Sequence, residues 1–174
     1  MSSILLLGDT SGSITVAAPA VAGSGTLTLP TGTATLGIQG PAFSAYNNSN
    51  ITCSTGTSTK LIFDTERFDT ANCYNSSTGR FTPTVPGYYQ FNAAVYSGDA
   101  PGTSFIKIQK NGSDYTRGAQ VAGANYQFTL SVMMYLNGTT DYVECYFDNN
   151  KGSTITINSY SFTNNFDGCL VRGA

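Results

Sequence analysis

Residues 63–91, which read FDTERFDTANCYNSSTGRFTPTVPGYYQF, decide the fold of this chain. Aromatic side chains recur along the segment and reach alternate positions at its end, where Tyr89 and Phe91 are two residues apart. A period of two places side chains on one face of a β-strand. Gly87 directly follows Pro86 and marks a bend before that strand. The segment therefore predicts short strands whose rings fill the space between two sheets about 10 Å apart.

The period-two pattern continues on the C-terminal side. Residues 88–96 and 126–136 carry apolar side chains at every second position, so we expect two core strands there. Asn137-Gly138 is a tight-turn signal and predicts a hairpin between 126–136 and 142–147. Further strands are expected at residues 105–110, which run into a second turn signal at Asn111-Gly112, and at 154–157 and 166–171. This count of strands predicts an all-β, two-sheet jelly roll.

Composition supports an all-β chain and excludes several classes of function. Gly, Ser, Thr and Asn fill 75 of 174 positions, beside 21 Phe and Tyr, which is typical of many short strands and turns. Only 10% of residues are charged and the net charge is −2, so neither nucleic acid nor an anionic membrane is an expected partner. The absence of His removes Ser-His-Asp and Cys-His catalysis and imidazole zinc sites.

The sequence shows no recognisable membrane or secretion signal. No stretch approaches the ~20 apolar residues needed to cross a bilayer. The first nine residues have no basic flank, and their apolar run is too short for a secretory signal. We therefore expect a soluble protein made in the cytosol. The four cysteines lie far apart with no C-x-x-C pair, so buried free thiols are expected at Cys53, Cys73, Cys145 and Cys169.

Seven positions have the spacing of a known family signature: Phe63, Asp69, Tyr74, Phe81, Gly87, Tyr89 and Phe91. This pattern resembles the C1q globular-head family, whose fold is shared with tumour necrosis factor. It departs at Ala93, where the family has an aromatic residue; this change trims the core without abolishing the strand. Supporting matches are Pro41-Ala-Phe43 at the domain start, Lys110-Asn-Gly112 after a strand, and Phe166-x-Gly168-x-Leu170 near the end.

The resemblance covers residues 41–174 and implies a C1q/TNF-like antiparallel jelly-roll sandwich. Its aromatic signature residues would serve as core. Domains of this family associate as tight trimers around an apolar axis, so the resemblance also implies a homotrimer. Exposed Tyr and aliphatic residues on the outer strand faces would be buried in that assembly.

Residues 1–40 differ in composition from the rest and form a candidate N-terminal domain. They carry one charge, Asp9, and three pieces at 13–17, 25–30 and 33–38 alternate Thr or Ser with aliphatic residues. Three such short strands cannot build a core of their own, so we expect a short extended β arm that buries its apolar face on sister chains or a larger assembly. A disordered leader is the alternative.

A second resemblance concerns the function of this arm. Residues 13–36 look like the Thr/Gly/Ala-rich leaders of tailed-bacteriophage structural proteins, and the chain has no Gly-X-Y collagen repeat. The combined resemblances imply a non-enzymatic virion protein: a homotrimeric capsid decoration, cement or head-fibre protein. It would be made in the bacterial cytoplasm and lie on the virion surface, with residues 1–40 contacting other capsid or tail proteins. The alternative is a tail-fibre receptor-binding protein that recognises a host glycan or protein; the near absence of a shaft favours the head.

Candidate sites for chemistry and binding are few. Polar loops that could contact a ligand contain Tyr46, Asn47 and Asn48, and also Asn72 and Asn75; such loops are equally ordinary solvated turns.

Acidic side chains give two further candidates. Asp64 and Glu66 would share one strand face, as a carboxylate pair of a glycosidase must, but a surface or turn role is favoured. A structural calcium ion is conceivable at Asp141, Glu144 and Asp148, although no Asp-x-Asp-x-Asp loop is present. No catalytic residue and no cofactor is therefore expected.

Overall fold

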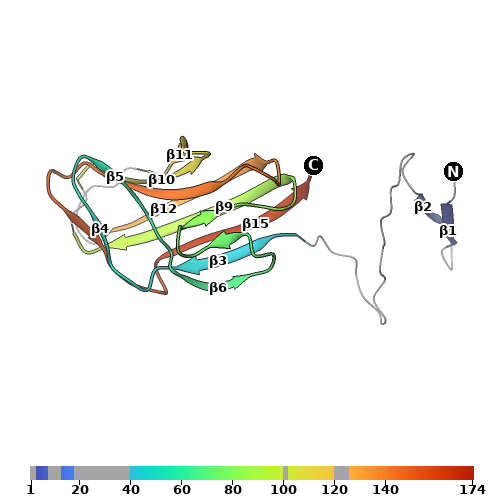
Figure 1. The fold of residues 1–174 in the computed structure, drawn as a ribbon, viewed down its shortest axis with the longest axis horizontal. Helices are drawn as coiled ribbons and strands as arrows, with labels where there is room; N and C mark the ends of the chain where they lie inside the picture. The colour runs from blue at the N-terminus through green and yellow to red at the C-terminus, as the bar shows by residue number, and fades with distance from the viewer. Residues whose placement is uncertain (1–2, 8–12, 18–39, 100–101, 120–125) are drawn as a thin grey trace. The chain divides into compact units, whose positions relative to one another are not determined.

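The computed structural model describes residues 3–7, 13–17, 40–99, 102–119 and 126–174. The chain divides into two units, residues 1–37 and 38–174 (Figure 1). In the first unit, β1 (Ser3–Leu7) pairs antiparallel with β2 (Ser13–Ala17). The predicted strand at 13–17 is confirmed, whereas those predicted at 25–30 and 33–38 lie outside the described residues.

In the second unit, all regular structure in the described residues is β. Its strands are β3 (Ala42–Tyr46), β4 (Ile51–Cys53), β5 (Thr57–Lys60), β6 (Thr65–Asp69), β7 (Tyr74–Asn75), β8 (Arg80–Phe81), β9 (Gly87–Ser97), β10 (Phe105–Lys110), β11 (Ser113–Arg117), β12 (Tyr126–Leu136), β13 (Val143–Asn149), β14 (Ile155–Ile157) and β15 (Asn165–Gly173). The strands predicted from the period-two pattern are therefore confirmed, most of them to within two residues.

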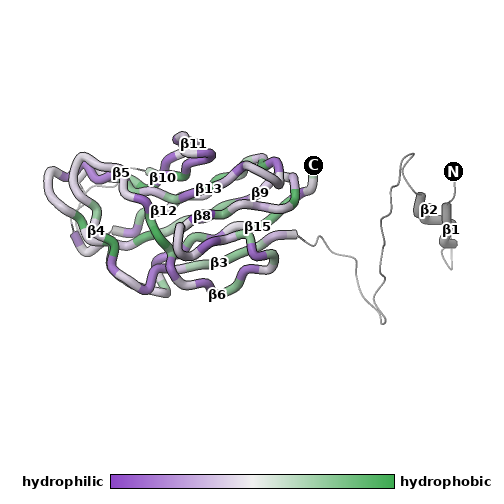
Figure 2. Tube along the Cα trace, viewed as in Figure 1, coloured by the Kyte–Doolittle hydropathy of each residue, from purple (hydrophilic) through white to green (hydrophobic). Residues whose placement is uncertain are grey.

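Two antiparallel sheets enclose the core (Figure 1). The first, which we call the β9 sheet, has the order β4-β14-β9-β15-β3-β6, and β12 pairs with β9 along its whole length. The second, the β13 sheet, has the order β11-β10-β13-β8-β7, and β5 also pairs with β13. Figure 2 shows β4 as hydrophobic and β11, at the edge of the β13 sheet, as hydrophilic.

The core between the sheets is built from stacked rings. Phe43 stacks on Tyr74 with centroids 4.7 Å apart and on Phe81 at 4.8 Å. The signature aromatics are all buried, which confirms their predicted role: Phe63, Tyr74, Phe81, Tyr89, Phe91 and Phe166. Such clusters of edge-to-face and offset rings add specific contacts to plain area burial.

The predicted hairpin between 126–136 and 142–147 is wrong. β12 pairs with β9, and β13 pairs with β10, β5 and β8, so the two strands belong to different sheets. The reason lies in their connection: Asn137 Oδ1 accepts backbone N–H groups of Thr139, Thr140 and Asp141, at 2.9–3.0 Å. This Asn-centred turn passes the chain across the core from one sheet to the other. Both strands then face the same core, which explains why their patterns look continuous.

The second turn signal does form a hairpin. Asn111 and Gly112 have φ values of 54° and 77° between β10 and β11, the left-handed pair that a tight two-residue turn requires.

The cysteines are all unpaired in this structure. Cys53, Cys73 and Cys145 are buried as expected, and burial raises the pKa of Cys53 to about 11 and also raises that of Cys145. Cys169 is exposed, contrary to the expectation, because it points away from the core on β15. Within the described residues, no helix has the length and apolar character needed to span a membrane.

Candidate functional site

The signature residues that are not aromatic either stabilise a turn or allow close packing. Asp69 Oδ2 accepts the backbone N–H of Tyr74 at 2.7 Å, so its carboxylate fixes the turn that follows β6. A Cβ added at Gly168 would lie 2.7 Å from ring atoms of both Phe43 and Phe91, and one at Gly87 would lie 2.4 Å from Arg172 O. Leu170 packs against the core from its edge. These residues stabilise the fold, and candidate functional sites lie on the surfaces of the domain.

The outward face of the β9 sheet is the most unusual of those surfaces. Large apolar side chains are exposed on it: Phe68 on β6, Tyr88 on β9, and Met133 and Tyr135 on β12. Tyr88 and Tyr135 are direct cross-strand partners, with ring centroids 5.6 Å apart. We call these four residues and the strands between them the assembly face. Monomeric proteins rarely expose large contiguous apolar patches, so the neighbouring side chains of Tyr88, Met133 and Tyr135 indicate a contact surface.

Two hollows mark the same face. One of about 290 Å³ lies over Asn92, Ala94, Ser131 and Asn165, and another of about 180 Å³ lies beside Phe68, Gln90 and Gly168. Asn92 lines both of them. The hollows exist because the strands place short side chains between the aromatic ones, and they give this face the relief that another protein surface could fill.

Polar groups lie at the centre of the assembly face. Gln90 Nε2 donates to Ser131 Oγ, which donates to Asn92 Oδ1, both at 2.9 Å. Asp167 Oδ2 accepts from Asn165, whereas Asp167 Oδ1 is buried and has no hydrogen-bond partner in the described part of the chain. A buried acceptor without a partner is costly, so a donor from outside this chain would stabilise it.

The first predicted ligand loop does not present all of its residues. Asn47 is fully buried: it accepts from Asn164 Nδ2 at 2.8 Å and donates to Asn158 O at 3.2 Å. Its amide joins loops and is not available to a ligand. Asn48 is exposed, and Tyr46 is half-buried with the Arg67 guanidinium 4.8 Å above its ring. A ligand role for these two stays a prediction.

The second predicted loop lies at the other end of β6. Tyr46 pairs with Thr65 at the start of β6, whereas Phe43 pairs with Asp69 at its end, just before Asn72. Asn72 is exposed and has a φ of 54°, and Asn75 Oδ1 accepts the backbone N–H groups of Ser77 and Thr78. The structure therefore does not bring the two loops together into one site.

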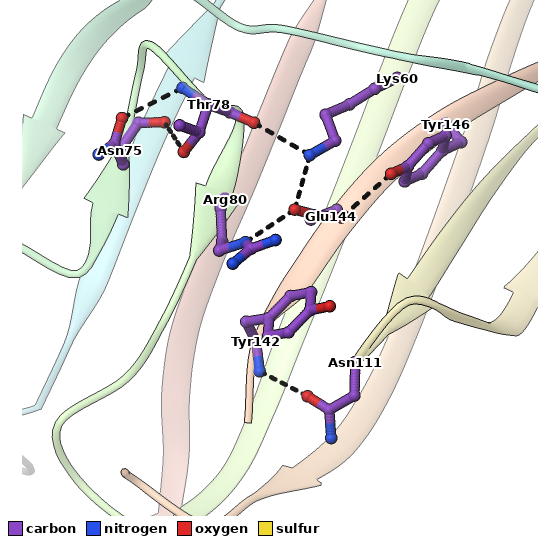
Figure 3. A network of polar contacts seen from close by, with 8 residues as sticks. All are labelled: Lys60, Asn75, Thr78, Arg80, Asn111, Tyr142, Glu144 and Tyr146. Atoms are coloured by element: carbon purple, nitrogen blue, oxygen red, sulfur yellow. Dashed lines mark hydrogen bonds and ion pairs between the residues drawn. The ribbon is translucent and has the colours of Figure 1, made fainter. Parts of the chain in front are cut away.

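Glu144 is the buried centre of a polar network on the β13 sheet, whose other members are partly exposed (Figure 3). Its Oε1 accepts from Lys60 Nζ and from Arg80 Nε, both at 2.7 Å, and its Oε2 accepts from Tyr146 OH at 3.1 Å. The Arg80 guanidinium also lies 3.7 Å from the centre of the Tyr142 ring. Burial opposes ionisation, but the hydrogen bonds from Lys60 and Arg80 outweigh it and lower the pKa of Glu144. Burial and the Glu144 charge raise the pKa of Tyr146 to about 12.

The three candidate calcium ligands are not brought together. Asp141 pairs with Lys110 Nζ at 2.9 Å, Asp148 pairs with Lys107 Nζ at 3.0 Å, and Glu144 is held as described above. Each carboxylate thus has its own cation. In the described ranges, no group of three or more potential metal ligands occurs.

Asp64 and Glu66 lie at the start of β6, and both are exposed. Asp64 Oδ1 accepts the backbone N–H of Asn48 at 2.6 Å and so supports the β3–β4 turn. This is the turn role that the sequence favoured. Nothing in the described residues points to catalysis.

Comparison with known proteins defines the class of this fold. Two curled antiparallel sheets with these partners form the C1q/TNF-like jelly roll. Residues 42–171 match the family model described as C1q domain, and the chain therefore belongs to the C1q domain family. No curated protein sequence matches the chain.

Solved structures of similar fold come from distant sequences. The globular domain of zebrafish complement 1qA protein has a TM-score of 0.56 and 17% identity, covering 78% of this chain and 100% of that chain. Murine APRIL has a TM-score of 0.61 and 8% identity, covering 76% and 100%. The PRD1 vertex protein P5 has a TM-score of 0.57 and 15% identity, covering 78% and 100%. At these identities the likeness is one of fold.

The residues of the assembly face were not among those predicted from the sequence, although most of them have a recognisable pattern there. Tyr88, Met133 and Tyr135 occupy the outward positions of strands whose inward positions are also apolar. Where a strand end is apolar on both faces, burial on both sides is indicated there, although Gln90, Asn92 and Ser131 keep the rest of this outward face polar. Phe68 carries no such signal, because β6 is short and otherwise polar.

Proposed function

We propose that the chain is a non-enzymatic structural subunit of a bacteriophage particle, in which three copies assemble through the assembly face and residues 1–40 attach the head domain to the virion. Capsid decoration, cement and head-fibre proteins are the roles that fit it best. The observation that carries the proposal is the set of exposed apolar side chains on this face, Tyr88, Met133 and Tyr135 on the paired strands β9 and β12, together with Phe68 on β6. Burying that area removes apolar surface from water and drives association.

Polar groups on the assembly face support the same reading. Asp167 Oδ1 needs a donor that this chain does not provide among its described residues. The adjoining hollow contains Asn92, whose amide nitrogen can donate from a neighbouring copy. Homo-oligomer interfaces are apolar at their core and still carry direct hydrogen bonds, so the polar groups at the centre of this face would have to pair across copies.

Support for a phage particle comes from two sources. The PRD1 vertex protein P5, a phage vertex protein, shares the fold over 78% of this chain. Residues 1–40, with Asp9 as their single charge, have the Thr/Gly/Ala-rich composition of phage leaders. A folded head domain with such an N-terminal segment suits attachment to a shell.

The trimer is tested by light scattering of the purified chain at micromolar concentration. We expect a mass about three times 18.3 kDa. Tyr88→Asp combined with Tyr135→Asp places two charges in the assembly face and should give a mass of one chain. Tyr115→Asp is the matched control, because Tyr115 is 49% exposed on β11 against 45% for Tyr88, but lies in the other sheet. A wild-type monomer would sink the trimer.

Location is tested separately by cryo-electron microscopy of the phage particle that carries this chain. We expect trimeric density on the capsid shell, with residues 1–40 between capsomers. Density at the tail tip would overturn the head role and favour the alternative, a tail-fibre protein that binds a host glycan or protein.

A further inference from the structure

A hollow of about 190 Å³ lies between β10 and β11, in the sheet that does not carry the assembly face. Its lining combines two aromatic rings, two cations, a carboxylate and a hydroxyl: Phe105, Tyr115, Lys107, Arg117, Asp114 and Thr116. It belongs neither to the Glu144 network nor to the predicted Asn-rich loops. Small binding sites commonly pair apolar ring surface with a few fixed polar groups in this way.

A β-bulge creates this arrangement. Gln109 pairs with Asp114 but Ile108 pairs with Thr116, so Tyr115 has no partner on β10. In a regular strand Asp114 and Tyr115 would point to opposite faces. The bulge instead lets both line one hollow, which is how bulges re-aim side chains at sites. Tyr115 remains 49% exposed there, with its ring free to contact a ligand.

The carboxylate in the hollow is fixed in position. Asp114 Oδ1 accepts from Gln109 Nε2 at 2.7 Å and Oδ2 accepts from Lys107 Nζ at 3.1 Å. The hydrogen bond from Gln109 has the largest effect on the pKa of Asp114, and that from Lys107 the next largest. Both lower this pKa, so the carboxyl group is ionised near neutral pH. Its side chain is nevertheless 62% exposed, which leaves acceptor positions open towards solvent. A rigid, solvent-facing acceptor is suited to receive ligand hydroxyl groups.

The buried cation of the hollow, Lys107, is paired with two carboxylates. Lys107 Nζ is nearly buried and lies 3.0 Å from Asp148 as well as close to Asp114. Asp148 Oδ1 is buried and has no hydrogen-bond partner among the residues described. The Arg117 guanidinium lies 5.1 Å from the centre of the Phe105 ring. Asp148 does not line the hollow but pairs with Lys107; with it, two positive and two negative groups balance, so the site has little net attraction for an anion.

We propose that this hollow binds one residue of a neutral saccharide. The Tyr115 ring would contact the C–H face of the sugar, Asp114 would accept from its hydroxyl groups, and Arg117 and Thr116 would donate to its oxygens. A sugar ring presents both an apolar face and alternating hydroxyls, which matches this lining better than an apolar or strongly charged ligand does. The volume suits one sugar unit, since pockets for drug-sized ligands measure about 300–1,000 Å³ and this hollow is smaller.

The site is formed within one chain, so the proposal does not depend on the trimer. The test is saturation-transfer NMR on the full chain with the methyl glycosides of glucose, galactose, mannose and N-acetylglucosamine as probes. We expect transfer to at least one of them, with a dissociation constant on the order of 1 mM for so small a ligand. Light scattering of the same samples separates a failure of assembly from a failure of binding.

Two variants locate the site. Tyr115→Ala and Asp114→Asn should each weaken binding at least tenfold while the melting temperature stays close to that of the wild type. Tyr160→Ala is the matched control, since Tyr160 is 41% exposed on the loop before β15 and should leave binding unchanged.

Glucuronate and N-acetylneuraminate are measured beside the four neutral glycosides as acidic comparison probes. Three outcomes would overturn the proposal: no transfer to any of the four neutral glycosides at 10-fold excess over the expected constant, undiminished binding by Tyr115→Ala, or a preference for either acidic sugar. The last result would mean that Arg117, rather than the balanced set, controls recognition.

Discussion

At the scale of single residues, Gly168 shows how tightly the signature specifies the core. A methyl group there would overlap the rings of Phe43 and Phe91, which are both fully buried and cannot move aside. We expect Gly168→Ala to lower the free energy of unfolding by about 1–3 kcal/mol. Gly173→Ala, in the same strand, is the control, because nothing lies within 4 Å of the added atom. Urea unfolding of both variants checks this, and equal midpoints would contradict it.

Glu144 is a residue whose charge matters to stability. Its side chain is 3% exposed, whereas Lys60 and Arg80 are 29% and 41% exposed and regain water when their partner is lost. We therefore expect Glu144→Gln to cost about 1–3 kcal/mol at neutral pH, below the range for a fully buried pair. Chemical denaturation at pH 7 measures it, with Glu66→Gln as the exposed control.

The same residue predicts a pH dependence. The folded-state pKa of Glu144 is lowered from the ordinary 4.5, so its contribution is present above that value and lost as pH falls through the lowered pKa. The gap in unfolding free energy between wild type and Glu144→Gln should then be constant from pH 7 to about 5 and shrink below pH 4. A gap that widens on acidification would show that Glu144 is not stabilised as an anion.

At the scale of elements, the sequence predicted strands better than it predicted their partners. The alternation in residues 126–136 correctly placed β12, because periodicity reports which side chains face a core. It could not report which strand lies beside it, since β12 and β13 both face the same interior from opposite sheets. The Asn-Gly signal correctly predicted a hairpin at Asn111 and wrongly predicted one at Asn137. At Asn137 the side chain accepts backbone hydrogen bonds in a longer turn, and this turn leads the chain to the other sheet.

The loop before β15 gives the prediction at this scale. Asn164 is fully buried, accepts the backbone N–H of Tyr96 at 2.7 Å, and donates to Asn47 and to Asn158 O, so it ties this loop to the ends of β9 and β3. Asn164→Ala removes these hydrogen bonds from a buried site and should cost about 1–3 kcal/mol. Amide hydrogen exchange should rise first around β14. Asn48→Ala, an exposed position, should change stability by less than about 0.5 kcal/mol.

At the scale of the whole molecule, what the sequence could say about function depended on the family spacing and the composition. The signature identified residues that turned out to be core, so it predicted a fold and, by resemblance, an assembly. It could not find the hollow at Tyr115, because a bulge moves this side chain out of the alternating pattern. Surface sites made by such irregularities depend on coordinates, whereas cores built by regular alternation do not.

The division of the chain gives the last prediction. Residues 38–174 form a unit of their own and carry both the core and the assembly face, so removal of residues 1–37 should leave the fold intact. We expect the truncated chain to melt within about 2 °C of the full chain, since a loss of 1 kcal/mol would shift a domain of this size by about 2–4 °C or more. If the assembly face alone drives association, the truncated chain should still form a particle with the mass of three chains. Its attachment to the phage particle should be lost. A truncated monomer beside a full-length trimer would instead place trimerisation in the arm and leave Tyr88 and Tyr135 to contact another virion protein.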